Sequence, residues 1–124
     1  MNYRGVIIEE SLSNLDVLKL IKITSTKIEP TTPRHKTPWV SQWTLHTVDI
    51  EEENAEKVAL LLSESIDTSH ATSWYADFKN LSTHYIVFPN KIFRVNLSDP
   101  TGYKDAKEYG VSIGIPEYQV DFDV

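Results

Sequence analysis

The sequence predicts an α+β fold: a mainly antiparallel β-sheet of about five to seven strands, one main helix packed on a face of the sheet, and a short C-terminal helix. Residues 73–96 alternate apolar and polar side chains in three short runs separated by turn residues, which is typical of an antiparallel meander. Residues 52–66 carry apolar side chains at helical spacing. Residues 3–50 contain strand-length runs rich in β-branched residues.

Length and composition indicate a single domain that spans residues 1–124. A chain of 124 residues, of which 40% are apolar, is long enough to bury a core without cross-links. There is no cysteine, so disulfides, thiolate zinc sites and thiol nucleophiles are excluded. The net charge of −6 repels a phosphate backbone, and we expect no nucleic-acid partner.

The N-terminal segment favours two strands joined by a helical turn. Residues 3–10 form a short run with an apolar centre, and Glu9 and Glu10 interrupt it where a secretion signal would continue. No run reaches the length of a membrane span, so we expect a cytoplasmic protein with no membrane partner. Ser13 and Asp16 resemble a capping box for a turn over residues 14–18. Residues 20–29 predict a long, half-buried strand.

Prolines at positions 30, 33 and 38 predict an extended surface loop that delivers Trp39 and Trp43 to the body of the domain. Residues 42–50 follow as a strand whose apolar parity changes midway, since Trp43 and Leu45 have one parity while Val48 and Ile50 have the other. This change predicts a β-bulge near His46 or Thr47.

The main helix is predicted over residues 52–66. The acidic run at positions 51–53 precedes it, and negative charge favours the positive end of the helix dipole. The helix should lie across the apolar face of the sheet through the side chains that repeat at helical spacing, Ala55, Val58, Ala59, Leu62 and Ile66.

The meander follows the main helix, with turns predicted at residues 80–82 and at Pro89-Asn90. Successive side chains of a strand point to opposite faces. This register predicts a core face that carries Trp74, Ala76, Phe78, His84, Ile86, Phe88, Phe93 and Val95. The second face would then carry Tyr75, Asp77, Lys79, Thr83, Tyr85, Val87, Ile92 and Arg94.

The C-terminal part predicts a short helix and a final strand. Asp99 is placed to cap a helix over residues 100–109, and Gly110 stands where a left-handed C-terminal residue is expected. Tyr118, Val120 and Phe122 alternate with polar residues. We therefore expect a strand that is covered on one face only and pairs within the domain or with a neighbouring chain.

Asp77, Tyr85 and Arg94 form a row across the three strands of the second face in this register. Such a row either recognises a polar ligand through hydrogen bonds or forms a solvated cross-strand ladder. The same register places His84 on the opposite face from Asp77, which argues against a pair and favours a core histidine.

His46 is a further candidate, since a bulge beside it would turn its side chain into a pocket. Trp39, Trp43 and Trp74 form either an aromatic wall of a ligand site or ordinary core. Metal binding is not expected, because the histidines at positions 35, 46, 70 and 84 are scattered. No cofactor is expected either, because the four glycines form no phosphate loop.

Four stretches resemble those in a small family of uncharacterised prokaryotic proteins. They are Trp43-Thr44-Leu45-His46-Thr47-Val48, Trp74-Tyr75-Ala76-Asp77-Phe78-Lys79-Asn80, His84-Tyr85-Ile86-Val87-Phe88 and Gly114-Ile115-Pro116-Glu117-Tyr118-Gln119. The resemblance implies a single domain of unknown function and assigns no activity or site residue.

The sequence therefore predicts a non-enzymatic module that binds a small molecule or assembles as a homo-oligomer through its exposed sheet or its C-terminal tail. The alternative is a small enzyme with a polar pocket. The candidate ligand-binding residues are Trp39, Trp43, His46, Asp77, Tyr85 and Arg94, of which the enzyme would use His46, Asp77, Tyr85 and Arg94.

Overall fold

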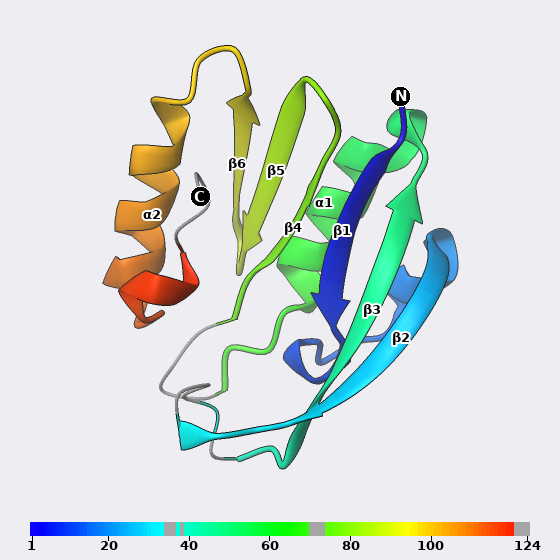
Figure 1. The fold of residues 1–124 in the computed structure, drawn as a ribbon, viewed down its shortest axis with the longest axis vertical. Coiled ribbons are helices and arrows are strands. Elements are labelled where there is room, and N and C mark those ends of the chain that lie inside the picture. Colours follow the sequence, from blue (N-terminus) through cyan, green and yellow to red (C-terminus); the bar gives the residue numbers. More distant parts are fainter. Residues whose placement is uncertain (34–36, 38, 70–73, 121–124) are drawn as a thin grey trace.

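The computed structural model describes residues 1–33, 37, 39–69 and 74–120, and it confirms the α+β fold. Six strands form one sheet in the order β2-β3-β1-β4-β5-β6 (Figure 1), and every neighbouring pair is antiparallel. The strands are β1 (Tyr3–Ile8), β2 (Lys22–Pro30), β3 (Gln42–Ile50), β4 (Ala76–Lys79), β5 (Thr83–Phe88) and β6 (Lys91–Asn96), and the α-helices are α1 (Ala55–Ser65) and α2 (Gly102–Ser112).

Short 3₁₀ helices join the N-terminal strands. Helix η1 (Glu9–Ser11) follows β1 and η2 (Asp16–Leu20) precedes β2. The predicted helical turn is thus present, but Ser13 does not cap it, because its Oγ donates to the carbonyl of Ser65 at 3.0 Å. Instead, Oδ1 of Asn14 accepts a bond from the N–H of Asp16 at 2.9 Å. A third 3₁₀ turn, η4 (Glu52–Asn54), leads into α1.

Helix α1 covers one face of the sheet, which we call the α1 face. Val58, Ala59 and Leu62 of this helix are completely buried. They share a single apolar cluster with four strands, and burial of such area is the main favourable term in folding. The strand side chains of the cluster are Tyr3, Ile7, Val48, Ile50, Ala76, Phe78, Tyr85 and Val87.

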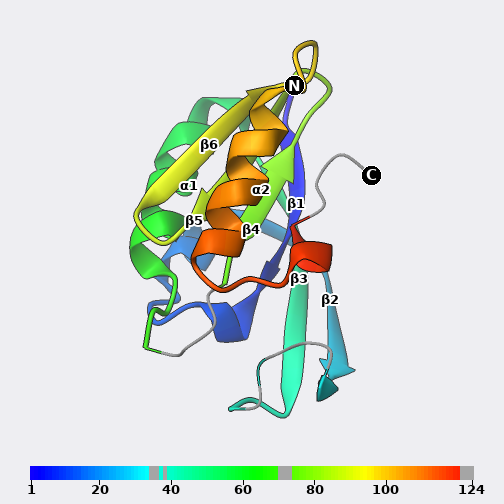
Figure 2. The same cartoon turned by 90° about the vertical axis from the view of Figure 1, so that its left-hand side faces the viewer.

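Helix α2 packs against the opposite face, which we call the α2 face. Its fully buried Ala106 belongs to a second apolar cluster with Ile86, Phe88, Val95, Ile115 and Val120. In Figure 1, α1 lies behind the sheet and α2 lies to the left of β6, and Figure 2 shows the two helices on either side of β6. Strand β5 is therefore buried from both sides, whereas no described helix covers β1 and β3 on the α2 face.

A two-residue turn decides how the faces of β4 and β5 combine. The N–H of Asn80 donates to the carbonyl of Thr83 at 3.0 Å, so the loop consists of Leu81 and Ser82 instead of the predicted residues 80–82. Oδ1 of Asn80 accepts bonds from the N–H groups of Ser82 and Thr83, both at 2.9 Å. Shortening the loop by one residue reverses the face of every side chain on one strand relative to the other.

The predicted grouping of the meander side chains is therefore wrong for β4. Ala76 pairs with Val87 and Phe78 pairs with Tyr85, so these four side chains share the α1 face. The second turn is confirmed at Pro89-Asn90, because Phe88 pairs with Lys91. The relative phase of β5 and β6 is consequently as predicted, and the side chains on their α2 face are His84, Ile86, Phe88, Phe93 and Val95.

The prediction of a β-bulge near His46 or Thr47 is wrong. Strand β3 pairs with β1 without interruption, and His46 occupies a regular position opposite Ile7. The register shift is on β2 between Ile23 and Ser25, where Thr24 is the extra residue. A bulge on β2 does not change which face the side chains of β3 occupy. The parity change along β3 arises because Trp43 and Leu45 lie on one face of the sheet and Val48 and Ile50 on the other.

The C-terminal part differs from the prediction in three respects. Helix α2 begins at Gly102 without a side-chain cap, and Asp99 accepts a bond from the hydroxyl of Thr101 at 2.7 Å instead of capping the helix. Helix α2 extends beyond Gly110, and a Cβ at this glycine would lie 2.8 Å from Val120, so the residue serves close packing instead of ending the helix. Gly114, with φ of 96°, has the left-handed conformation. The predicted final strand is wrong for the described residues, since η5 (Glu117–Gln119) is a 3₁₀ helix, and Phe122 lies outside them.

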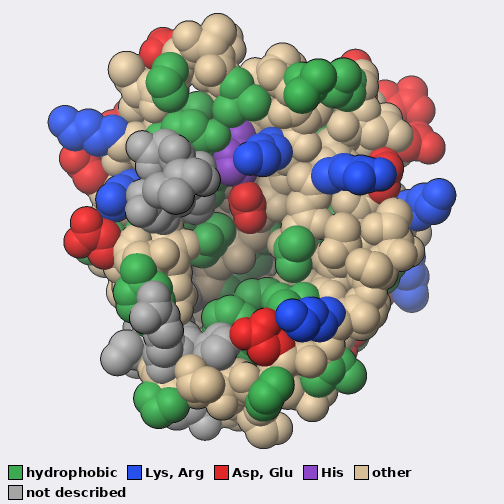
Figure 3. Space-filling view, in the orientation of Figure 1, with side chains coloured by type: hydrophobic (Ala, Val, Ile, Leu, Met, Phe, Trp, Pro, Cys, Tyr) green, Lys and Arg blue, Asp and Glu red, His purple; other side chains and the backbone are tan. Residues whose placement is uncertain are grey.

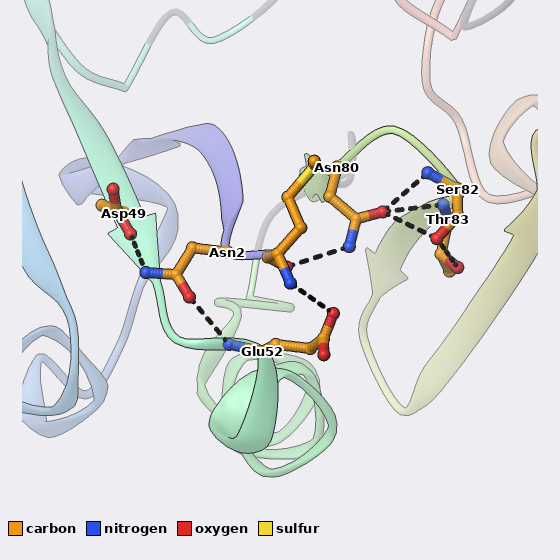
Figure 4. Close-up of polar contacts among 7 residues, drawn as sticks. Asn2, Asp49, Glu52, Asn80, Ser82 and Thr83 are labelled. Carbon is orange, nitrogen blue, oxygen red and sulfur yellow. Dashed lines mark hydrogen bonds and ion pairs between the residues drawn. The ribbon is translucent and has the colours of Figure 1, made fainter.

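Polar contacts join three segments at the end of the sheet where β1 begins (Figure 4). The Met1 amino group lies 2.8 Å from Oε2 of Glu52, and Nδ2 of Asn80 donates to the carbonyl of Met1 at 3.1 Å. Nδ2 of Asn2 donates to Oδ1 of Asp49 at 3.2 Å. These bonds hold the start of β1 against the end of β3 and against the β4–β5 turn.

Candidate functional site

Asp77, His84 and Tyr103 form a continuous hydrogen-bonded chain on the α2 face. Nε2 of His84 lies 2.7 Å from Oδ2 of Asp77, and Nδ1 of His84 lies 2.8 Å from the Tyr103 hydroxyl. The carboxylate comes from β4, the imidazole from β5 and the phenol from α2. His84 is 2% exposed, whereas the Asp77 side chain is 37% exposed. The chain thus connects a buried imidazole with a carboxylate that solvent reaches.

The partners of His84 define where its protons lie. An ionised carboxylate accepts hydrogen bonds and donates none, so Nε2 of His84 must carry a hydrogen. In the neutral ring, Nδ1 then accepts the bond from the Tyr103 hydroxyl. In the imidazolium, Nδ1 donates to the phenol oxygen instead. The chain accommodates both protonation states of His84 without moving a heavy atom.

Tyr75 lies beside the hydrogen-bonded chain of Asp77, His84 and Tyr103, and the charge of Asp77 affects the pKa of its phenol. Its hydroxyl donates to the backbone carbonyl of Gln119. Burial raises the pKa of the Tyr75 phenol well above its ordinary value, and the nearby Asp77 carboxylate raises the pKa further. Both effects keep the phenol neutral, so Tyr75 acts as a hydrogen-bond donor in the wall of the site.

Cationic and apolar side chains extend the site over β1 and β4. Lys79 is the cross-strand partner of His84, and Arg4 is the partner of Lys79, so both cations share the α2 face. Val6, which is 44% exposed, is the partner of Asp77. Figure 3 shows this side of the molecule hollowed near its centre, with a histidine between an acidic and a basic side chain above the hollow.

The predicted row of Asp77, Tyr85 and Arg94 is wrong for Asp77. Tyr85 and Arg94 are cross-strand partners on the α1 face, whereas Asp77 pairs with Ile86 and lies on the α2 face. The prediction that Asp77 and His84 do not pair is wrong for the same reason. The cause is the two-residue β4–β5 loop.

Tyr85 and Arg94 form a separate contact. The Arg94 guanidinium lies 5.6 Å from the centre of the Tyr85 ring, in cation–π geometry. The ring also stacks on Phe78 at 5.1 Å. Burial raises the pKa of the Tyr85 phenol, Arg94 opposes this rise, and Tyr3 and Glu56 add to it. The Arg94 guanidinium thus covers the ring of Tyr85, which belongs to the α1-face cluster.

His46 belongs to a polar cluster at the other end of the α1 face. Its Nδ1 lies 2.9 Å from Oγ1 of Thr26, and its Nε2 lies 3.0 Å from Oε1 of Glu9. The adjacent Glu10 accepts bonds from the N–H and the hydroxyl of Thr44, at 2.5 and 2.7 Å. This cluster fastens η1 to β3, and it does not meet Asp77, which is on the opposite face.

The three tryptophans gather as a cluster next to the α1-face core. The rings of Trp39 and Trp74 are 6.1 Å apart and nearly perpendicular, and those of Trp43 and Trp74 are 5.5 Å apart. Trp74 is 4% exposed, while Trp39 and Trp43 are half-buried. Nε1 of Trp43 donates to Oγ1 of Thr37 at 2.9 Å. The three rings thus pack on one another, with Trp74 in the core and Trp39 and Trp43 at its edge.

Tyr103 is the member of the site that the sequence analysis missed. It stands one helical turn before Ala106 and two turns before Gly110, the buried residues of α2. This spacing places Tyr103 on the inward face of the helix. The sequence pattern contains no signal for which strand that face meets, so the phenol could not be assigned to His84.

The described residues contain neither a cluster of metal ligands nor a membrane-spanning helix. Among them, no group of three or more His, Asp or Glu side chains is close enough to hold a metal ion. No helix in the described part of the chain has both the length and the apolar character to cross a bilayer.

Comparison with known proteins leaves the geometry as the basis for assigning a function. No family model matches the chain, and no curated protein or solved structure gives a significant match. The resemblance to uncharacterised prokaryotic proteins stays a prediction.

Proposed function

We propose that this protein is a binding module for a small polar molecule and that its ligand contacts the α2 face at Asp77. The observation that carries the proposal is the chain of Asp77, His84 and Tyr103, in which both nitrogens of a buried imidazole are engaged. Because His84 donates to one carboxylate oxygen, Asp77 is held in place while it remains open to solvent.

The surroundings of Asp77 favour a ligand of the hydroxy-acid or amino-acid class. Asp77 accepts hydrogen bonds, so it suits a hydroxyl or ammonium group of the ligand. Lys79 and Arg4 lie on the same face and suit an anionic group. Val6 supplies an exposed apolar contact between the strands. A molecule with a carboxylate next to a hydroxyl or amine satisfies all three.

NMR titration with lactate and with L-serine tests this proposal. We expect chemical-shift changes in the backbone of β1 and β4 and in the imidazole of His84, with acetate and ethylamine as single-group controls. Asp77→Asn should weaken binding about tenfold, because it removes a charge-assisted hydrogen bond. Asp105→Asn makes the same charge change on an exposed position of α2 and should leave the affinity unchanged.

Two outcomes would contradict the proposal. The first is the absence of any shift change on β1, β4 and His84 with either probe up to solubility. The second is equal binding to D77N and the unsubstituted protein. Backbone resonances of α1 and β6 that keep their positions in D77N would establish that the fold is kept, so a loss of binding is not a loss of structure. The His84 ring resonances are not used for this control, because Nε2 of His84 bonds directly to Asp77.

A catalytic role is the second candidate function. The hydrogen-bonded chain of Asp77, His84 and Tyr103 is the observation that favours it. A neutral imidazole between a phenol and a carboxylate passes protons between them, as general acid–base catalysis requires. Such an enzyme would use Asp77, His84 and Tyr103 instead of His46, Tyr85 and Arg94. Slow conversion of a bound probe, followed by NMR, would distinguish catalysis from binding. The cytoplasmic location expected from the sequence is part of both proposals.

A further inference from the structure

Strand β2 forms the sheet edge farthest from α2 (Figure 1). All its residues except Glu29 are exposed. Ile28, on the α1 face, is 61% exposed, which is unusual for a large apolar side chain in a strand. Lys27 and Glu29 flank it and point to the α2 face, because their partners on β3 are Leu45 and Trp43. Within the described part of the chain, Lys27 makes no ion pair.

The pairing with β3 defines which backbone groups of β2 point outward. The N–H of Thr31 donates to the carbonyl of Ser41 at 3.1 Å, and Pro30 is the partner of Gln42. In an antiparallel pair, residues alternate between bonding to the neighbouring strand and facing away from it. Thr26, Ile28 and Pro30 consequently present their backbone groups to the open edge. Pro30 has no N–H group, so Thr26 and Ile28 supply the outward donors of this segment.

Few registers allow the β2 strands of two copies to pair antiparallel about a two-fold axis. Cross-strand partners must point to the same face of the joined sheet, so the sequence numbers of two partners differ by an even number. The two-fold axis therefore passes through a residue of the regular segment and not between two residues. An axis at Lys27 sets Lys27 against itself, and an axis at Glu29 sets Glu29 against itself, which is unfavourable. An axis at Thr26 brings the bulged Thr24 into the pairing.

An axis at Ile28 gives the complementary register. Lys27 of each copy lies opposite Glu29 of the other, and the two exposed Ile28 side chains meet on the α1 face. The N–H of each Ile28 bonds to the carbonyl of the other Ile28, and the N–H of each Thr26 bonds to the carbonyl of the other Pro30. Both outward donors of each segment are used, and the missing N–H of Pro30 leaves no donor unpaired.

We infer that the partner of this edge is a second copy of the chain, paired through β2 with the two-fold axis at Ile28. The pairing joins two sheets into one continuous sheet and leaves the α2 face near Asp77 open. Lysines, bulges and prolines also occur on strands that are kept apart from other chains. Exchanging the charges of Lys27 and Glu29 by substitution distinguishes an edge that pairs with a second copy from an edge that is protected against pairing.

Sedimentation equilibrium of the full chain over a wide concentration range tests the inference. We expect a mass that rises to that of a dimer. Lys27→Glu and Glu29→Lys should each weaken the dimer about tenfold, because each replaces two opposite-charge pairs with two like-charge pairs. The exchange K27E/E29K should restore the original affinity. Lys22→Glu, on the same strand beyond the bulge, is the control for net charge.

Three results would overturn the inference. They are a monomer at every concentration, a dimer that K27E weakens no more than K22E does, and an exchanged variant that stays as weak as the single ones. Circular dichroism of each variant would establish that the fold is kept, and recovery in K27E/E29K is independent of any loss of stability in the single variants.

Discussion

The phenol of Tyr75 is partly buried on the α2 face, close to the carboxylate of Asp77. Its pKa is raised above the ordinary value of about 10, so the folded protein retains this proton at a pH where the unfolded chain releases it. The proton release favours the unfolded chain, and the stabilisation is lost as the pH rises above that ordinary value. Tyr75 therefore makes the protein sensitive to alkali.

The first prediction is that Tyr75→Phe flattens the dependence of stability on alkaline pH. The free energy of unfolding should fall as the pH rises above about 10, with a slope of up to about 1.4 kcal/mol per pH unit from this group. Urea denaturation at several pH values would measure the slope, which should be smaller in Y75F. Tyr118→Phe, at a position that is 45% exposed, is the control. An equal slope in Y75F and the unsubstituted protein would refute the prediction.

Residue patterns identified part of the candidate site. Asp77 was named as a candidate ligand-binding residue, whereas His84 was interpreted as a core histidine on the opposite face. Their contact depends on a loop of two residues instead of three, and the side chain of Asn80 stabilises that loop through bonds to Ser82 and Thr83. Both loop lengths are compatible with the sequence near Asn80, so the pairing could not be predicted from it.

At the scale of elements, β5 explains why the meander register was ambiguous. Its sequence from Tyr85 to Phe88 is apolar on both parities, and each of these residues is buried in the structure. Alternation identifies a buried face only when the other face is exposed. Helix α2 removes that contrast, because it covers the second face of β5 and β6.

The second prediction concerns the contact between β1 and β4 at Gly5. A Cβ on Gly5 would lie 2.1 Å from the carbonyl oxygen of Asp77 and 2.8 Å from Cα of Phe78. Gly5→Ala should therefore push β4 away from β1 and lower the free energy of unfolding by about 1–3 kcal/mol or more. It should also shift the His84 resonances, since Asp77 moves with β4.

Gly102→Ala is the matched control, because its Cβ would make an ordinary contact of 3.4 Å with Val95 at the start of α2. We expect its effect to stay within about 1 kcal/mol. Urea denaturation of both variants gives the comparison. Equal stability of G5A and G102A would show that β1 and β4 tolerate a side chain between them.

At the scale of the molecule, one sheet separates two apolar clusters of different composition. All three tryptophans of the chain pack with the α1-face cluster, whereas the α2-face cluster contains phenylalanine and tyrosine rings. Tryptophan fluorescence therefore reports on the α1-face cluster, against which all three rings pack. Because β5 contributes side chains to both clusters, we expect the two faces to fold as one cooperative unit.

The third prediction tests this cooperativity with two matched substitutions. Ile86 belongs to the α2-face cluster and Ile7 to the α1-face cluster, and both are completely buried. Ile86→Val and Ile7→Val should each lower stability by about 0.5–1.5 kcal/mol through the loss of one methylene group. Both should shift the urea midpoint of tryptophan fluorescence. A midpoint unchanged in I86V, with a shifted transition of the Ile115 and Val120 methyl resonances of the α2-face cluster, would mean that the two faces unfold separately.

The α+β class, the main helix and the approximate positions of all six strands could be predicted from the amino-acid sequence alone. These features follow from local periodicity and from turn residues, which short stretches of chain carry. The tertiary structure decided which strand faces meet, because one residue in the β4–β5 loop and the coverage of β5 by α2 set that relation. The contact of Asp77 with His84 and Tyr103 joins three elements, and its geometry exists only when they pack together.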